Sequence, residues 1–152
     1  MDCCENDSLW KLSVGRLIRH CDPITCNEEF PVDVWDTGLS VEMIYHCLQN
    51  EELMIPDHVG AAPRDPMVHA GRIAWLVENG WHDAIEIDVG VPGAPGQRDH
   101  WPVTDGNHRL AAAIIRGDDA IEASISGSID HAHRLFMDIC HLDKPPCYES
   151  GP

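Results

Sequence analysis

The chain has 152 residues, and its 26 acidic and 10 basic side chains give a formal net charge of −16 at pH 7. A length of this order predicts one domain, 1–152, that is large enough to bury a hydrophobic core. Duplex DNA binding requires Lys and Arg side chains that displace counterions from phosphates, so the acidic balance disfavours a nucleic-acid partner. It favours a small ligand that needs only a local cationic pocket.

The sequence carries no targeting or membrane signal. No run approaches the roughly 18 apolar residues of a membrane-spanning helix, and the acidic first residues do not form a basic-then-apolar signal peptide. We therefore expect a cytoplasmic protein without a membrane partner. The seven cysteines indicate reduced thiols and not a disulfide framework. We expect residues 1–9 and 144–152 to be flexible.

The first half of the chain gives short and mixed patterns. In chain order, it predicts a strand followed by a turn over 12–18, a short strand over 32–35, a helix over 41–50 and a loop over 56–66. The first pattern breaks at Asp22-Pro23, because the residue before a proline avoids the helical conformation. Ser40 is a good N-cap for the helix, whose apolar residues fall on one face.

The second half of the chain is more regular. It predicts a helix over 67–79, a strand over 84–89, a loop over 90–97, a strand over 101–104, a helix over 107–116, a strand over 120–126 and a helix over 128–141. Gly80 and Gly117 follow two of these helices, at the position where a glycine commonly ends a helix. Alternating helices and strands of this kind predict one domain of mixed α/β (α+β) class.

The run from Thr104 to Arg109 is the strongest candidate for a functional site. A strand ends here, Gly106 turns the chain, and a helix begins at Asn107. The first N–H groups of a helix lack intrahelical acceptors and, with the helix dipole, form a site for an anion such as phosphate. Arg109 can bind phosphate oxygens in a bidentate manner. A cation at this end of a helix opposes the dipole, which hints at a function for Arg109.

Asp105 and His108 each have more than one interpretation. Asp105 could cap the helix, hold a metal ion or act as a base, and capping is a common role for Asp at this position. His108 could contact a ligand or be an ordinary surface histidine. Because the residues alone do not choose between these roles, both alternatives stay open.

The stretch from about 68 to 127 resembles the ParB/sulfiredoxin superfamily. Its most specific part is the run Asp-Gly-Asn-His-Arg-Leu-Ala-Ala, which begins at Asp105. The matching segments are the helix around 72–76, the strand 84–87, the strand, turn and Ala-rich helix over 103–113, Gly117 and the strand 121–125. The resemblance implies a small mixed sheet flanked by helices, with this stretch as its core.

The same resemblance implies how a nucleotide would be bound. The His-Arg pair, here His108 and Arg109, would clamp the phosphates together with the turn residues Gly106 and Asn107. The preceding helix would add Arg72, with Asn79 as a weaker candidate. Sulfiredoxins carry a catalytic Cys where this chain has Asn107, so we do not expect sulfinic-acid reduction. Partition proteins carry two arginines and further domains, so we do not expect a full partition protein either.

The function implied is phosphate chemistry. The motif is similar to that of free-serine kinases and of small plasmid-borne members proposed as ATPases or nucleases. We expect ATP or another nucleotide, with Mg²⁺, and hydrolysis or transfer of a phosphoryl group in which Asp105, His108 and Arg109 are catalytic. The alternatives are a nuclease acting on DNA and a non-catalytic inhibitor or interaction module with a protein partner.

Two further groups of residues are weaker candidates for binding a ligand. His131, His133, Cys140 and His141 lie close together in sequence, but their spacing is not that of a zinc site, so we expect no metal there. Several tryptophans precede the motif and could stack on a base, with Trp101 as the best candidate. Core or rim positions are the ordinary alternative for them.

Overall fold

The computed structural model describes residues 9–25, 38–56, 65–93, 101–136 and 140–141. Its strands are β1 (Leu9–Ser13), β2 (Ile85–Asp88), β3 (Val103–Asp105), β4 (Ala120–Ser126) and β5 (Cys140–His141). Its helices are α1 (Val14–Leu17), α2 (Val41–Gln49), α3 (Pro66–Asn79), α4 (Asn107–Arg116) and α5 (Ile129–Phe136). The mixed α/β class predicted from the sequence is confirmed.

The strands form one mixed sheet in the order β3-β2-β4-β1-β5. Strand β2 runs parallel to β4, and the other neighbouring pairs are antiparallel. Side chains alternate between the two faces along each strand. The buried face carries apolar residues of β1, β2 and β4, whereas the opposite face exposes Lys11, Glu86 and Glu122.

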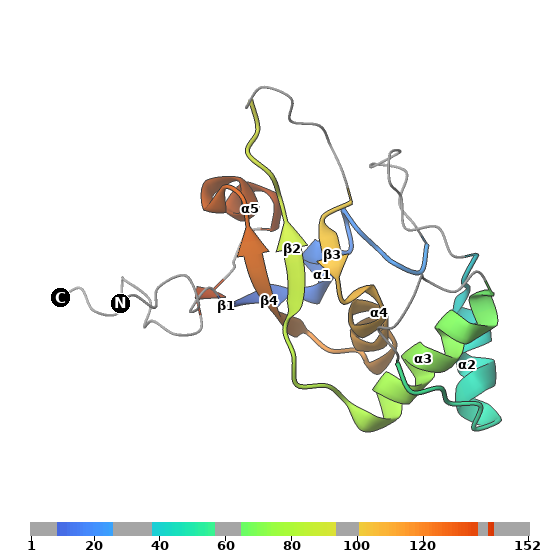
Figure 1. Ribbon diagram of the computed structural model, residues 1–152. Helices are drawn as coiled ribbons and strands as arrows, with labels where there is room; N and C mark the ends of the chain where they lie inside the picture. Colours follow the sequence, from blue (N-terminus) through green and yellow to red (C-terminus); the bar gives the residue numbers. More distant parts are fainter. Residues whose placement is uncertain (1–8, 26–37, 57–64, 94–100, 137–139, 142–152) are drawn as a thin grey trace.

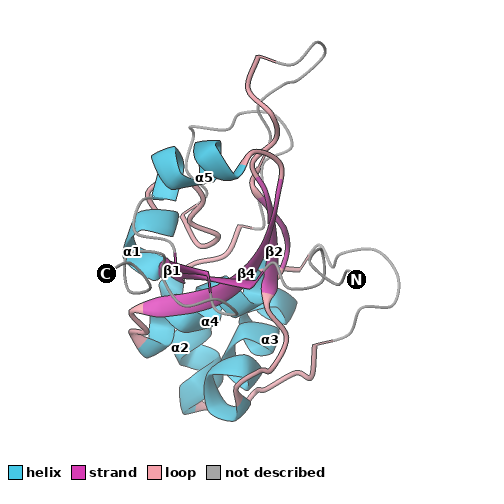
Figure 2. Ribbon diagram, turned by 90° about the vertical axis from the view of Figure 1, so that its left-hand side faces the viewer, coloured by secondary structure: helices cyan, strands magenta, loops and turns pink. Residues whose placement is uncertain are grey.

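Helix α4 lies directly against the sheet, and the other long helices follow outward from it. Figure 1 shows α4 beside the strands, with α3 and then α2 beyond it. Figure 2 shows the same three helices gathered on one side of the strands, with α5 away from them. The sequence 107–116 can occupy this central position because its buried alanines are small enough to pack on two sides.

The core consists of two groups of buried residues that meet at α4. The first lies between the sheet and helices α1, α4 and α5, and includes Leu12, Leu110 and Phe136. The second lies between α2, α3 and α4, and includes Ile44 and Ile73. Helix α4 is therefore packed on two sides through its middle residues, Leu110 to Ala113. Across the described ranges, no helix combines the length and the apolar character needed to cross a bilayer.

Most helices and strands predicted from residue 41 onward are confirmed to within one or two residues. The helices predicted over 41–50, 67–79 and 107–116 correspond to α2, α3 and α4, and the strand over 120–126 to β4. The strands predicted over 84–89 and 101–104 correspond to β2 and β3. The loop predicted over 56–66 ends one residue early, because Asp65 caps α3 and Pro66 is its first residue.

Two predictions were wrong. A strand followed by a turn was expected over 12–18, but the strand lies earlier, at Leu9–Ser13, and a short helix follows it. The Ser13 side chain accepts a hydrogen bond from the Arg16 N–H and so starts α1. The helix expected over 128–141 stops at Phe136, and Cys140–His141 instead pairs with β1 as strand β5. The predicted strand 32–35, residues 57–64 of the predicted loop, and residues 1–8 and 144–152 of the predicted flexible ends lie outside the described residues, whereas Leu9 belongs to β1.

Candidate functional site

The turn between β3 and α4 depends on Gly106. This residue is the N-cap of α4 and has φ +105°, in the left-handed region. A Cβ atom added here would lie 2.5 Å from Cγ2 of Ile85. The glycine therefore allows both the turn and the close packing of α4 against β2. The space beside its Cα is filled by Ile85, so a ligand would approach the turn from another side.

Helix α4 begins without a side-chain cap. By contrast, Ser13, Ser40 and Asp65 accept hydrogen bonds from the first N–H groups of α1, α2 and α3. The capping role considered for Asp105 is therefore wrong. Its carboxylate instead forms an ion pair with Arg109, with 3.3 Å between Oδ2 and Nη2. The dipole at the start of α4 is consequently not offset by a capping side chain.

His108, in the first turn of α4, contacts a histidine of α3. Its Nε2 lies 2.7 Å from Nδ1 of His69, and the ring centroids are 5.0 Å apart. At this distance one imidazole donates a hydrogen bond and the other accepts it. His69 is only 2% exposed, so the pair ties the start of α3 to the start of α4. The sequence analysis did not single out His69, which sits on the buried side of its helix.

Arg72 lies one turn after His69 on α3. Its Nε atom is buried and has no hydrogen-bond partner among the described residues. A buried donor without an acceptor is costly, which makes Arg72 a candidate for contact with an anion. Asn79, the weaker candidate, lies at the far end of α3 and donates to the carbonyl of Trp75.

The guanidinium of Arg109 already binds other groups of the protein. Its Nη1 donates to the backbone carbonyls of Asp83, at 2.9 Å, and Ala84, at 3.0 Å. Its Nη2 faces Asp105, and its side chain is only 11% exposed. The guanidinium thus holds the beginning of β2 against α4. A bidentate clamp on phosphate would have to compete with these three contacts.

Asn107 is a structural residue of the turn. It is 8% exposed, its Oδ1 accepts a hydrogen bond from Nε1 of Trp101 at 2.8 Å, and its Nδ2 donates to the carbonyl of Val103 at 3.1 Å. Trp101 is itself 5% exposed. Its indole is therefore a core group that fixes the turn, and its faces are not open for stacking on a base.

The described residues contain no group of three or more His, Cys, Asp or Glu side chains arranged to hold a metal ion. His131 and His133 lie on α5. The side chains of Cys140 and His141 lie outside the described set, so the prediction about a zinc site there stays a prediction. Asp105, half exposed at the end of β3, supplies a carboxylate next to the start of α4.

Comparisons of this chain with protein-family models, with curated proteins and with solved structures found no match. The relation to the ParB/sulfiredoxin superfamily therefore stays a prediction from the motif. The candidate site consists of the uncapped start of α4, the His69–His108 pair and Asp105, with Arg72 one turn further along α3.

Proposed function

We propose that this protein binds the phosphates of a nucleotide, with Mg²⁺, at the start of α4, and that it hydrolyses or transfers one phosphoryl group. The observation that carries the proposal is the uncapped first turn of α4 beside the His69–His108 pair. The N-terminal end of a helix carries about half a positive charge and directs N–H groups outward, which suits a phosphate.

His108 and Arg72 are the side chains best suited to contact the phosphates. A pair of hydrogen-bonded imidazoles can take up one proton and keep its hydrogen bond, since the imidazolium donates to the neutral ring. That charge would be favoured when an anion lies at the start of α4. The Nε of Arg72, which has no acceptor in the part of the chain that the structure describes, would add a charge-assisted hydrogen bond.

Arg109 and Asp105 have different roles in this proposal. Arg109 positions the turn, because its contacts with the carbonyls of Asp83 and Ala84 join α4 to β2. Asp105 would supply an oxygen ligand for the Mg²⁺ that accompanies the nucleotide, since Mg²⁺ is commonly bound by one or two carboxylates together with phosphate oxygens. The Arg109–Asp105 contact would loosen when the metal binds.

Calorimetric titration tests the proposal. ATP, ADP and CTP, each with Mg²⁺, are titrated into the wild type, His108→Glu, Arg72→Met and His82→Glu. A glutamate in the first turn suits the helix dipole but repels phosphate. Because His108→Glu also removes the contact with the buried His69, circular dichroism first checks that the variant is folded. His82→Glu is the matched control, because it changes the charge equally at an exposed residue elsewhere.

We expect at least one nucleotide to bind, with affinity lowered by roughly tenfold or more in His108→Glu and Arg72→Met. The control should bind as the wild type does. Release of phosphate from the bound nucleotide then separates hydrolysis from binding alone. Absence of binding at millimolar concentration, or equal losses in His108→Glu and His82→Glu, would contradict the proposal.

A further inference from the structure

The two members of the histidine pair differ in burial. His69 of α3 is only 2% exposed, whereas His108 of α4 is partly buried. Nδ1 of His69 and Nε2 of His108 are 2.7 Å apart, so a proton lies between these two atoms. Burial disfavours a charged imidazole, and a positive charge on the pair is therefore more stable on His108 than on His69.

The place of the charge determines the direction of the hydrogen bond. An imidazolium donates from both ring nitrogens and accepts from neither. When His108 carries the charge, its Nε2–H therefore donates to Nδ1 of His69, and the proton of neutral His69 is on Nε2. The proton that charges His108 is then the one on its Nδ1.

We propose that His69 is a positioning residue, which accepts the hydrogen bond from His108 and so allows His108 to become an imidazolium when a tetrahedral dianion binds at the start of α4. The hydrogen bond at one ring nitrogen of a histidine sets the protonation of the other. His69 acts through His108 and does not touch the ligand. Because the charge is needed only when an anion is bound, this role rests on the proposed phosphate site, to which it adds the uptake of one proton with each dianion.

The charged groups near the pair keep His108 neutral until the anion arrives. Around the starts of α3 and α4, the described side chains with charge are the helix cap Asp65, the ion pair of Asp105 with Arg109, and Arg72. Helix α2, which packs on α3, places apolar residues in the shared core. Arg72 and the uncapped dipole of α4 both oppose a second positive charge, and a bound dianion removes that opposition.

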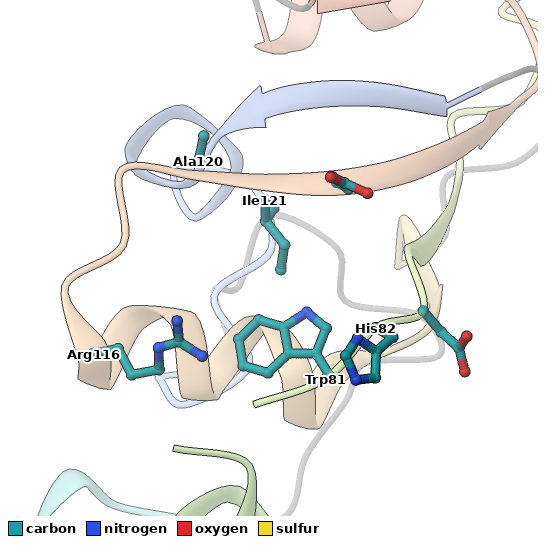
Figure 3. Close-up of a pocket in the computed structure, with 7 residues that line it drawn as sticks. Trp81, His82, Arg116, Ala120 and Ile121 are labelled. Atoms are coloured by element: carbon teal, nitrogen blue, oxygen red, sulfur yellow. The ribbon is translucent and has the colours of Figure 1, made fainter. Parts of the chain in front are cut away.

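The other place where an anion could bind lies at the far end of α4. Trp81, His82 and Arg116 line a cavity of about 350 Å³ there, and Figure 3 shows the indole ring of Trp81 between the other two side chains. Arg116 already has a partner, since its Nε lies 3.4 Å from Oδ2 of Asp118. The C-terminal end of a helix also repels anions. The cavity is therefore the weaker anion site, and the indole N–H signal of Trp81 reports binding to it.

Sulfate is the probe, because it remains a dianion between about pH 6 and pH 8, whereas phosphate itself titrates in this range. It is added without Mg²⁺, so that no metal ion takes part. The ring ¹⁵N signals of histidine-labelled protein give the affinity for sulfate, the pH at which His108 gains its second proton, and the tautomer of His69. His108→Gln identifies the His108 signals.

Three variants separate the role of His69 from a general effect of histidine charge. His69→Leu removes the acceptor, whereas His69→Asn keeps one, because its Oδ1 can accept from Nε2 of His108. His82→Asn is the matched control at an exposed histidine. Circular dichroism checks that each variant is folded, and the tautomer measured in the wild type does not depend on any variant.

We expect the affinity of the wild type for sulfate to rise about tenfold from pH 8 to pH 6, because an ordinary histidine titrates in this range. Bound sulfate should move the protonation of His108 to higher pH, so binding weakens as the pH rises through that value. His69→Leu should show a rise of less than about threefold, which measures the effect of the remaining histidines. His69→Asn and His82→Asn should keep most of the wild-type rise.

The possible failures are distinguishable. The absence of sulfate binding at every pH, or a response of Trp81 alone, would contradict the phosphate site and the role of His69 together. Binding at the start of α4 with the same pH dependence in the wild type and in His69→Leu would overturn the role of His69 and leave the phosphate site standing. A proton on Nδ1 of His69 in the sulfate-bound wild type would do the same.

Discussion

Replacing Arg109 by Met separates its structural role from a direct role in phosphate binding. The substitution keeps the hydrocarbon part of the side chain and removes the guanidinium, which donates to the carbonyls of Asp83 and Ala84. A hydrogen bond from a charged donor contributes about 1.5–3 kcal/mol. Asp83 is exposed, so water can replace the hydrogen bond that its carbonyl accepts from Arg109. The carbonyl of Ala84 lies in a part-buried position, where the lost hydrogen bond is harder to replace. We expect the free energy of unfolding to fall by about 2–3 kcal/mol.

Asp105→Asn is the matched comparison for this experiment. It removes the ion pair with Arg109 but leaves the two hydrogen bonds to the backbone in place. Asp105 is half exposed, so its ion pair should contribute only about 0.2–1 kcal/mol. The loss in Arg109→Met should therefore be at least twice the loss in Asp105→Asn.

Urea unfolding followed by circular dichroism measures both free energies, provided that the variants keep the m-value of the wild type. Losses that are equal and below about 1 kcal/mol would refute the reasoning, since surface ion pairs alone have that size. The guanidinium would then not hold β2 in place. It would instead be available for the phosphate clamp that the family resemblance implies.

Three other substitutions or treatments have expected outcomes. Gly106→Ala should lower the free energy of unfolding by more than about 2 kcal/mol, because the residue has φ +105° and the new Cβ would collide with β2; urea titration checks this. Trp101→Phe should cost about 1–3 kcal/mol by the same assay, since it leaves the buried Oδ1 of Asn107 without its donor. Burial, and secondarily Glu52, raise the pKa of Cys47 above its ordinary 9.0, so alkylation at about pH 8, read by mass spectrometry, should be much slower in the native than in the unfolded protein. Alkylation of Cys47 in the native protein as fast as in the unfolded protein would contradict the raised pKa. Because the thiol of the unfolded protein ionises first, the contribution of Cys47 to the free energy of unfolding should also decline as the pH rises above 9.0.

The helices could be predicted because their ends carry explicit local signals. Ser40 caps α2, and Gly80 and Gly117 end α3 and α4, as the sequence indicated. The short elements could not be predicted in the same way. Strand β5 has two residues and exists through pairing with β1, a contact between segments more than a hundred residues apart. No local pattern encodes such a pairing.

The turn of the candidate site could be predicted from the sequence, but the contacts that its side chains make with other segments could not. Gly106 followed by strong helix formers indicated the start of α4. The contact between His69 and His108 spans 39 residues, and a histidine on the buried face of a helix gives no sign of it. Arg109 at a helix N-terminus indicated a ligand, yet the backbone carbonyls that satisfy it belong to the segment before β2, which only the folded chain brings near.

The position of the bound phosphate tests the central claim most directly. Backbone amide signals of ¹⁵N-labelled protein are followed as ATP with Mg²⁺ is added, and inorganic phosphate serves as the minimal probe. The account predicts that the amides of Gly106, Asn107, His108 and Arg109, at the uncapped start of α4, shift first and most, and that His108→Glu removes these shifts. Shifts confined to other elements, or the same shifts in His108→Glu, would contradict it.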